Sequence, residues 1–134
     1  MEELSSSYAD NLRILDSVLR TEENIDIVKR RLAIGKDELT LYYIDGFMKD
    51  DVMQKLILHF ISLDGIGVEG EGAAREFADR SIPHIEVKVS NSLEQVVSMF
   101  LGGSAAIAGS IFGKNMIIVD AKSYPQRSTT EPES

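Results

Sequence analysis

The sequence predicts a single α/β domain in which helices pack on a mixed β-sheet, and three observations lead to this fold class. The chain has 134 residues, which is enough for one domain with a sizeable core and too few for two ordinary domains. Hydrophobic residues make up 43% and charged residues 27% of the chain, as is usual for soluble globular proteins. Segments with helical spacing of apolar residues alternate with strand-like segments, which favours a sheet covered by helices.

The first two helices are indicated by a capping aspartate ahead of an apolar stripe. Asp10 is the candidate N-cap of the first helix, and Asp50 or Asp51 is that of the second, which Gly65 would stop. The two stripes consist of Leu12, Ile14, Leu15, Val18 and Leu19, and of Val52, Met53, Leu56, Ile57, Phe60 and Leu63.

Between these helices, two strands are expected to form a hairpin. Ile25–Ile34 reads as a strand, and Lys29-Arg30-Arg31 in its middle indicates an edge-like or partly solvated position. Leu39–Ile44 ends at Asp45-Gly46 and predicts a strand that is buried on both faces. The short link Gly35–Glu38 would pair the two strands.

Two further helices are predicted in the second half of the chain. A glycine-rich, acidic connection, Gly65–Gly72, precedes a short helix over Ala73–Asp79. Asn91 followed by Glu94 resembles a capping box, and Gly102 would end the helix that follows it. The apolar face of this helix consists of Leu93, Val96, Val97, Phe100 and Leu101.

The remaining strands complete the sheet. Ile82–Val89 alternates apolar and polar residues, as a half-exposed strand does. Ser104–Phe112 and Met116–Asp120 read as a second hairpin joined at Gly113-Lys114-Asn115. After Ala121 the apolar residues disappear, so we expect the domain to cover residues 1–121 and residues 122–134 to form a polar, proline-containing linker.

The charge balance limits the partners of this domain. The net charge is −8, which repels nucleic acid, so we expect no nucleic-acid partner. The absence of cysteine excludes disulfides and thiolate chemistry and agrees with a reducing, cytoplasmic compartment. The acidic N-terminus is unlike a signal peptide. Gly102-Gly103 divides the uncharged stretch Gln95–Gly113, so we predict no transmembrane segment.

One glycine pattern has the spacing of a dinucleotide-binding loop. Gly65-Ile66-Gly67-Val68-Glu69-Gly70 matches that spacing, but it follows an amphipathic helix where the motif requires a buried strand. Glu69 and Glu71 would also repel the phosphates. We therefore interpret the segment as a loop between helices and expect no cofactor.

The other chemistry-bearing residues favour structural roles. His59 and His84 are the only histidines, and nothing in their spacing brings them together with a carboxylate. Asp50-Asp51 and the acidic loop lack the alternating ligands of a calcium site, so we expect no metal. The basic run Lys29-Arg30-Arg31 is interpreted as a solvated or salt-bridged strand. No catalytic motif is present, so we predict that the chain is not an enzyme.

Several stretches of the sequence resemble a known family. They are Leu41–Phe47, Leu101–Ile107, Met116–Arg127 and Glu131-Pro132, and together they resemble the spore germinant receptor A-subunit family, of the GerA type. Ser123-Tyr124-Pro125 favours its stage V sporulation protein AF branch. The resemblance implies an N-terminal soluble subdomain of a spore inner-membrane protein, placed on the cytoplasmic side and acting in germinant sensing or in assembly of an ion-release complex.

The resemblance also implies partners and site residues. The partners would be other subunits of a spore membrane complex and a small nutrient germinant, with the membrane reached through a region outside this chain. The candidate ligand-binding or interface residues, which lie in the matching stretches, are Asp45, Gly46, Asp120, Arg127 and Glu131.

Simpler interpretations stay open for these residues and for the function. Asp45-Gly46 can merely close a strand, and Arg127 can pair locally with Glu131. The first functional alternative is a scaffold that docks or oligomerises through an exposed sheet edge without a ligand. The second is a small soluble enzyme, which would require His59 and His84 to share a pocket with a carboxylate.

Overall fold

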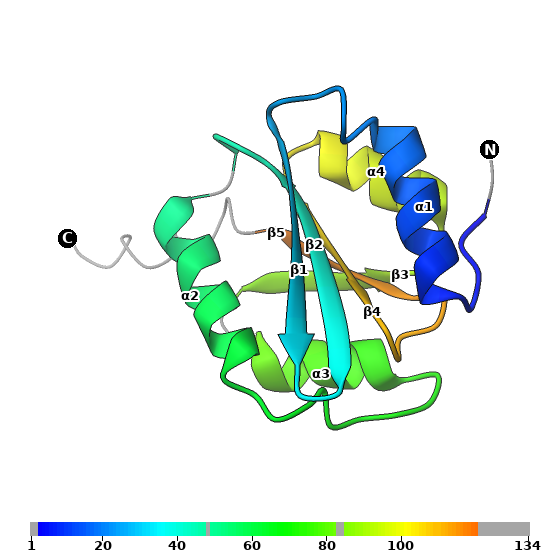
Figure 1. The fold of residues 1–134 in the computed structure, drawn as a ribbon, viewed down its shortest axis with the longest axis vertical. Helices are drawn as coiled ribbons and strands as arrows, with labels where there is room; N and C mark the ends of the chain where they lie inside the picture. Colours follow the sequence, from blue (N-terminus) through cyan, green and yellow to red (C-terminus); the bar gives the residue numbers. More distant parts are fainter. Residues whose placement is uncertain (1–2, 48, 83–84, 121–134) are drawn as a thin grey trace.

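The computed structural model describes residues 3–47, 49–82 and 85–120 (Figure 1). The elements in chain order are α1 (Tyr8–Leu19), β1 (Ile27–Ile34), β2 (Asp37–Ile44), α2 (Asp50–Ile61), α3 (Ala73–Ser81), β3 (Glu86–Ser90), α4 (Leu93–Leu101), β4 (Ala105–Gly109) and β5 (Met116–Asp120).

The strands form one five-stranded sheet in the order β1-β2-β4-β5-β3. Both predicted hairpins are present, since β1 pairs with β2 and β4 pairs with β5. The predicted α/β fold class, with helices packed on one sheet, is confirmed. The expected sheet was mixed, but every pair of described strands is antiparallel. β2 pairs antiparallel with β4, and β3 with β5, as the strands of the two hairpins do.

Helices cover both faces of the sheet, so the domain has three layers. In Figure 1, α1 and α4 lie together on one side of the sheet, while α2 and α3 lie on the other. The core under α2 and α3 includes Phe60, Phe77 and Phe112, with successive ring centroids 5.7 and 5.8 Å apart. The core under α1 and α4 is built around Leu15, Val96, Phe100, Met116 and Ile118.

The predicted apolar stripes face these cores, except that Leu101 at the end of α4 is 62% exposed, and the helix caps differ from the prediction. Asp10 is not the N-cap of α1: Ser7 is, and its hydroxyl accepts a hydrogen bond from the Asp10 amide. In α4 the N-cap is Ser92 in place of Asn91. A serine hydroxyl reaches the amide three residues ahead, which satisfies one free N–H of the first turn. The N-cap of α2 is Lys49, in place of the predicted Asp50 or Asp51. The predicted caps were therefore wrong by one to three residues, although the helices were right.

The end of α2 also differs from the prediction. The helix ends at Ile61, so Leu63 and Gly65 lie beyond it. The amides of Ser62 and Leu63 donate to the carbonyls of His59 and Phe60, closing the last turn earlier than the apolar pattern indicated.

Three strands are shorter than their sequence patterns. β1 begins at Ile27 because the Ile27 amide closes a turn onto the Asn24 carbonyl. β3 begins at Glu86, and Ile82 is instead the buried C-terminal cap of α3. β4 ends at Gly109, where a Cβ atom would lie only 2.5 Å from the Phe112 ring. The chain turns back there, because the phenylalanine ring packs directly on the glycine.

The first hairpin depends on a glycine. Gly35 has φ +61°, and a Cβ atom at this position would lie 1.7 Å from the carbonyl oxygen of Asp64. Only glycine combines that backbone angle with so close an approach. The turn between β1 and β2 is thereby packed against the loop that follows α2.

Among the described residues, no helix combines the length and the apolar character that crossing a bilayer requires. The predicted linker, residues 122–134, lies outside the described part of the chain.

Candidate functional site

A polar groove lies between α1 and the strands β1 and β2. Its volume is about 830 Å³. Residues of both charges line it: Arg13, Arg20, Lys29 and Arg31 on the basic side, and Asp16, Glu22, Glu23 and Glu38 on the acidic side. The groove is therefore balanced in charge, within a chain whose net charge is −8.

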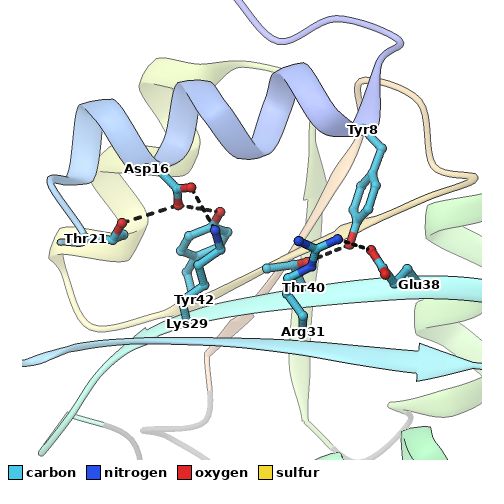
Figure 2. Close-up of polar contacts among 8 residues, drawn as sticks. All are labelled: Tyr8, Asp16, Thr21, Lys29, Arg31, Glu38, Thr40 and Tyr42. Atoms are coloured by element: carbon cyan, nitrogen blue, oxygen red, sulfur yellow. Dashed lines mark hydrogen bonds and ion pairs between the residues drawn. The ribbon is translucent and has the colours of Figure 1, made fainter.

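Strand geometry explains why these side chains meet. Successive residues of a strand point to opposite faces, so Lys29 and Arg31 share the face that α1 covers, as Figure 2 shows. The register places Lys29 opposite Tyr42 and Arg31 opposite Thr40. A row of polar side chains consequently runs beneath α1.

The first cluster in this row is centred on Asp16, which projects from α1 (Figure 2). The Lys29 ammonium lies 2.7 Å from Asp16 Oδ2, and the Tyr42 hydroxyl donates to Asp16 Oδ1 over 3.0 Å. The Thr21 hydroxyl donates to the same oxygen over 3.3 Å. The Lys29 ammonium also lies 5.8 Å from the centroid of the Tyr42 ring, within range of a cation–π contact.

The second cluster joins the start of α1 to the same two strands. The hydroxyls of Tyr8 and Thr40 lie 2.6 Å apart, and Arg31 Nη2 lies 2.8 Å from Glu38 Oε1. Burial raises the pKa of Tyr8. The hydrogen bond from Arg31 lowers the pKa of Glu38, and the same contact raises the pKa of Arg31. Both ionic forms are therefore stabilised at neutral pH.

Tyr42 is buried beneath the groove and hydrogen-bonded to Asp16, which lines it. Its side chain is fully inaccessible, and this burial, together with the nearby Asp16 carboxylate, raises its pKa well above the usual range. The phenol stays neutral and acts as a hydrogen-bond donor. The clusters around Asp16 and Tyr8 thus fix α1 on the sheet, and they supply paired charges that a polar ligand would have to share.

The basic run, interpreted from the sequence as a salt-bridged or solvated strand, is salt-bridged at Lys29 and Arg31, which confirms that interpretation. The groove itself was not predicted. The sequence contains a signal for the groove, because the charged residue Asp16 interrupts the apolar stripe of the first helix. The strand that follows carries cations at alternate positions, Lys29 and Arg31.

Three predicted site residues lie together at one end of the sheet. β2 and β5 run in the same direction, since both are antiparallel to β4. Tyr42 pairs with Ala106 and Ala106 pairs with Ile118, so the ends of the two strands, at Ile44 and Asp120, lie at the same level. Asp45 and Gly46 follow directly after Ile44, and both are exposed.

Two exposed apolar side chains accompany them at this end. Ile25 precedes β1 and is 96% exposed, and Phe47 follows Gly46 and is 49% exposed. They are brought to the same end because Ile27 pairs with Ile44, and the Asp45 amide donates to the Asp26 carbonyl over 2.7 Å. We call Ile25, Asp45, Gly46, Phe47 and Asp120 the sheet-end surface.

The other predicted residues are not brought into a site by the described structure. Arg127, Glu131 and His84 lie outside the described residues. His59 lies exposed on α2, with its ring 6.1 Å from that of Phe60. Within residues 3–47, 49–82 and 85–120, no three His, Asp or Glu side chains are grouped as metal ligands. The glycine pattern Gly65–Gly70 lies between α2 and α3, in the expected interhelical position.

A second groove, of about 880 Å³, lies beside that interhelical loop. Asp37, Asp64 and Glu69 outnumber Lys36 in its lining, and Asp37 Oδ2 accepts a hydrogen bond from the Ile66 amide. Asp37 therefore holds the loop against the β1–β2 hairpin.

Comparison with known protein families gives one match over most of the chain. The family model described as Bacillus/Clostridium GerA spore germination protein matches residues 14–134. The chain belongs to the GerA family. No sequence among curated proteins matches it significantly.

Among solved structures, the GerA-family chain is similar to the N-terminal domain of the A subunit of the Bacillus megaterium spore germinant receptor GerK3. The TM-score is 0.70 at 17% sequence identity, and the match covers 88% of this chain and 47% of the other. The two share a fold, and the chain spans about half of the GerK3 domain.

Proposed function

We propose that this GerA-family domain is a non-catalytic module that helps to assemble a germination complex on the cytoplasmic side of the spore inner membrane. Its partners are the other subunits of that complex. The membership of the family and the fold shared with a germinant receptor A subunit support a role in germination. The membrane is reached through a region outside this chain, and the domain is formed by residues 1–121, with residues 122–134 as a linker.

The sheet-end surface is the observation that carries this proposal. Ile25 and Phe47 are both exposed at the end of the sheet where Asp45 and Gly46 follow β2, although they are far apart in the sequence. Leaving apolar area in water costs about 25 cal/mol per Å², so clustered exposed apolar groups with a polar rim are typical of protein interfaces. We place Asp45, Gly46 and Asp120 in this interface, and Arg127 and Glu131 in its continuation along the chain.

The groove beneath α1 supports a role other than catalysis. Asp16 and Glu38 are each paired with a cation at 2.7 and 2.8 Å, and the buried phenol of Tyr42 holds its proton at neutral pH. General acid–base chemistry needs a group that titrates near the working pH. Beneath α1, the pKa of Glu38 is lowered and that of Tyr42 is raised, so both are shifted away from neutral pH.

Substitution of the apolar pair tests the assembly role. A chain with Ile25→Ser and Phe47→Ser, expressed in spores in place of the native protein, should fold normally because both side chains are exposed. We expect its recovery with other spore membrane proteins to fall several-fold. The matched control is Leu58→Ser with Leu101→Ser, since these side chains are 60% and 62% exposed on other elements. Equal recovery of all three proteins would contradict the proposal.

We also place the chain in the stage V sporulation protein AF branch, on the basis of Ser123-Tyr124-Pro125. The proteins recovered with the native chain test this assignment. Recovery of stage V sporulation proteins is expected, and recovery of nutrient receptor subunits alone would contradict it.

The groove favours germinant sensing as a second candidate function. A polar space of about 830 Å³ lined by charges of both signs suits a small solute with polar or ionic groups. Calorimetric titration of the chain with amino acids and sugars tests it. Saturable binding that Lys29→Gln weakens would favour sensing, and the absence of heat with every solute would leave assembly as the function.

A further inference from the structure

The outer edge of β1 is an open sheet edge of eight residues. β1 pairs along its whole length with β2, and none of the described strands lies on its other side. In an antiparallel pair, about half of the residues direct their N–H and C=O groups away from the partner. Within the described residues, no turn, loop or cap hydrogen bond uses the backbone of residues 28–34. α2 packs against β1 from one face of the sheet, so an added strand would enter along the unpaired backbone beside α2.

This edge carries the basic run of the chain on both of its faces. Lys29 and Arg31 point toward α1, as Figure 2 shows, and the alternation of the strand directs Arg30 to the face that α2 covers. Arg30 is exposed and forms no ion pair with the described residues, while 57% of the Arg31 side chain remains accessible. An added strand would thus meet Arg30 on one face of the sheet and, on the other, the side chains of Lys29 and Arg31, which are salt-bridged to Asp16 and Glu38.

The same charges disfavour a second copy of this chain as the added strand. Antiparallel pairing of β1 with β1 of another copy would bring two basic runs face to face, and like charges opposite each other destabilise a sheet. The other edge strand, β3, presents Lys88 at its centre. A net charge of −8 adds repulsion between copies. Cations on an open edge also prevent indiscriminate aggregation, so they select the partner by its charge.

We infer that the outer edge of β1 is a strand-addition site for an extended acidic segment of a partner protein. Backbone hydrogen bonds along residues 28–34 would supply the affinity, and carboxylates at alternate positions of the incoming strand would meet Arg30 on one face or Lys29 and Arg31 on the other. This inference rests on the proposed assembly function and names the chemistry of one partner surface.

A peptide titration followed by NMR tests the inference on the full chain. The probe is an end-blocked octapeptide of alternating Glu and Thr, and the comparison peptide has Lys in place of Glu. We expect saturable shifts of the amide resonances of residues 28–34 with the acidic peptide and none with the basic one. The affinity should fall as the salt concentration rises, because the pairs are exposed.

Two charge reversals locate the binding edge. Arg30→Glu should weaken binding of the acidic peptide about tenfold, since an attraction becomes a repulsion. Lys88→Glu makes the same charge change on the exposed edge strand β3 and should leave the affinity unchanged.

Several results would overturn the inference. They are equal binding of both peptides, shifts confined to β3 or α1, no saturable shift at millimolar peptide, and a dimer of the chain through β1 in light scattering. None of them bears on the sheet-end surface, whose failure is seen in the recovery of the Ile25 and Phe47 variant from spores. The two proposals can therefore fail separately.

Discussion

At the scale of single residues, the face of β2 beneath α1 carries polar side chains at buried positions. Thr40 and Tyr42 are fully buried, yet both hydroxyls are hydrogen-bonded to side chains of α1. A buried hydroxyl without a partner would be costly, so these bonds fix how α1 lies on the strand. The partner of Thr40 is Tyr8 of α1, and the partner of Tyr42 is Asp16 of α1.

Replacement of Tyr42 by Phe should change the response of the protein to alkaline pH. Burial raises the pKa of Tyr42 above the unfolded value of 10.0. Its contribution to stability is therefore complete below pH 10 and is lost as the pH rises toward the folded pKa, by about 1.4 kcal/mol per pH unit. Tyr42→Phe should cost about 1 kcal/mol at pH 7, through the lost bond to Asp16, and should show a shallower alkaline loss.

Urea unfolding between pH 8 and 11 measures both effects. Tyr43→Phe serves as the control, because it removes a neighbouring hydroxyl and leaves Tyr42 in place. Identical alkaline slopes for the native chain and Tyr42→Phe would show that the phenol is not held neutral by the fold.

At the scale of elements, the two edge strands are protected in different ways. β1 is long and carries the basic run, whereas β3 has five residues and alternates charged with apolar ones. Both patterns limit uncontrolled pairing, because a strand that joins must accommodate the exposed charges. The length of β1 nevertheless offers more backbone to a partner of the right charge.

The pairing of β3 with β5 contains a like-charged pair that can be relieved. Glu86 lies directly opposite Asp120 at the end of the two strands. Like charges at such positions are destabilising and opposite charges are favourable, by about 0.2–1 kcal/mol. Glu86→Lys should therefore raise the midpoint of thermal unfolding by a few degrees, which calorimetry measures. Glu71→Lys makes the same change of net charge in an exposed loop. A similar rise of the unfolding midpoint in that variant would show that the change of net charge alone causes the effect.

At the scale of the whole molecule, the three layers predict a gradient of stability across the sheet. Every residue of β4 is buried, and the strand lies between β2 and β5 with helices on both faces. β1 and β3 each have one free edge. Amides that open only in global unfolding exchange most slowly with solvent.

Hydrogen–deuterium exchange followed by NMR tests this gradient. We expect the amides of β4 and β5 to exchange at least tenfold more slowly than the amides of β1 that point away from β2. Equal protection along both sides of β1 would mean that its outer edge is already covered, which would contradict the open edge on which the strand-addition site depends.

The sequence by itself determined the class of fold and most of its elements. Apolar spacing in α1 and α2 and alternation in β3 reflect which side of each element is buried, and this information is local. The caps at Ser7 and Ser92 were missed because several neighbouring polar residues have similar capping propensity. The GerA resemblance also depended on short local stretches, and the family match confirmed it.

Only the tertiary structure decided which distant residues share a site. Lys29 meets Asp16, and Ile25 and Phe47 come to the same end of the sheet, because of the register of β1 on β2 and the position of α1. A one-residue shift of register would direct Lys29 and Arg31 to the opposite face of the sheet, where α2 packs. Strand register and layer order are set by the packing of both cores at once, and no local pattern in the chain specifies them.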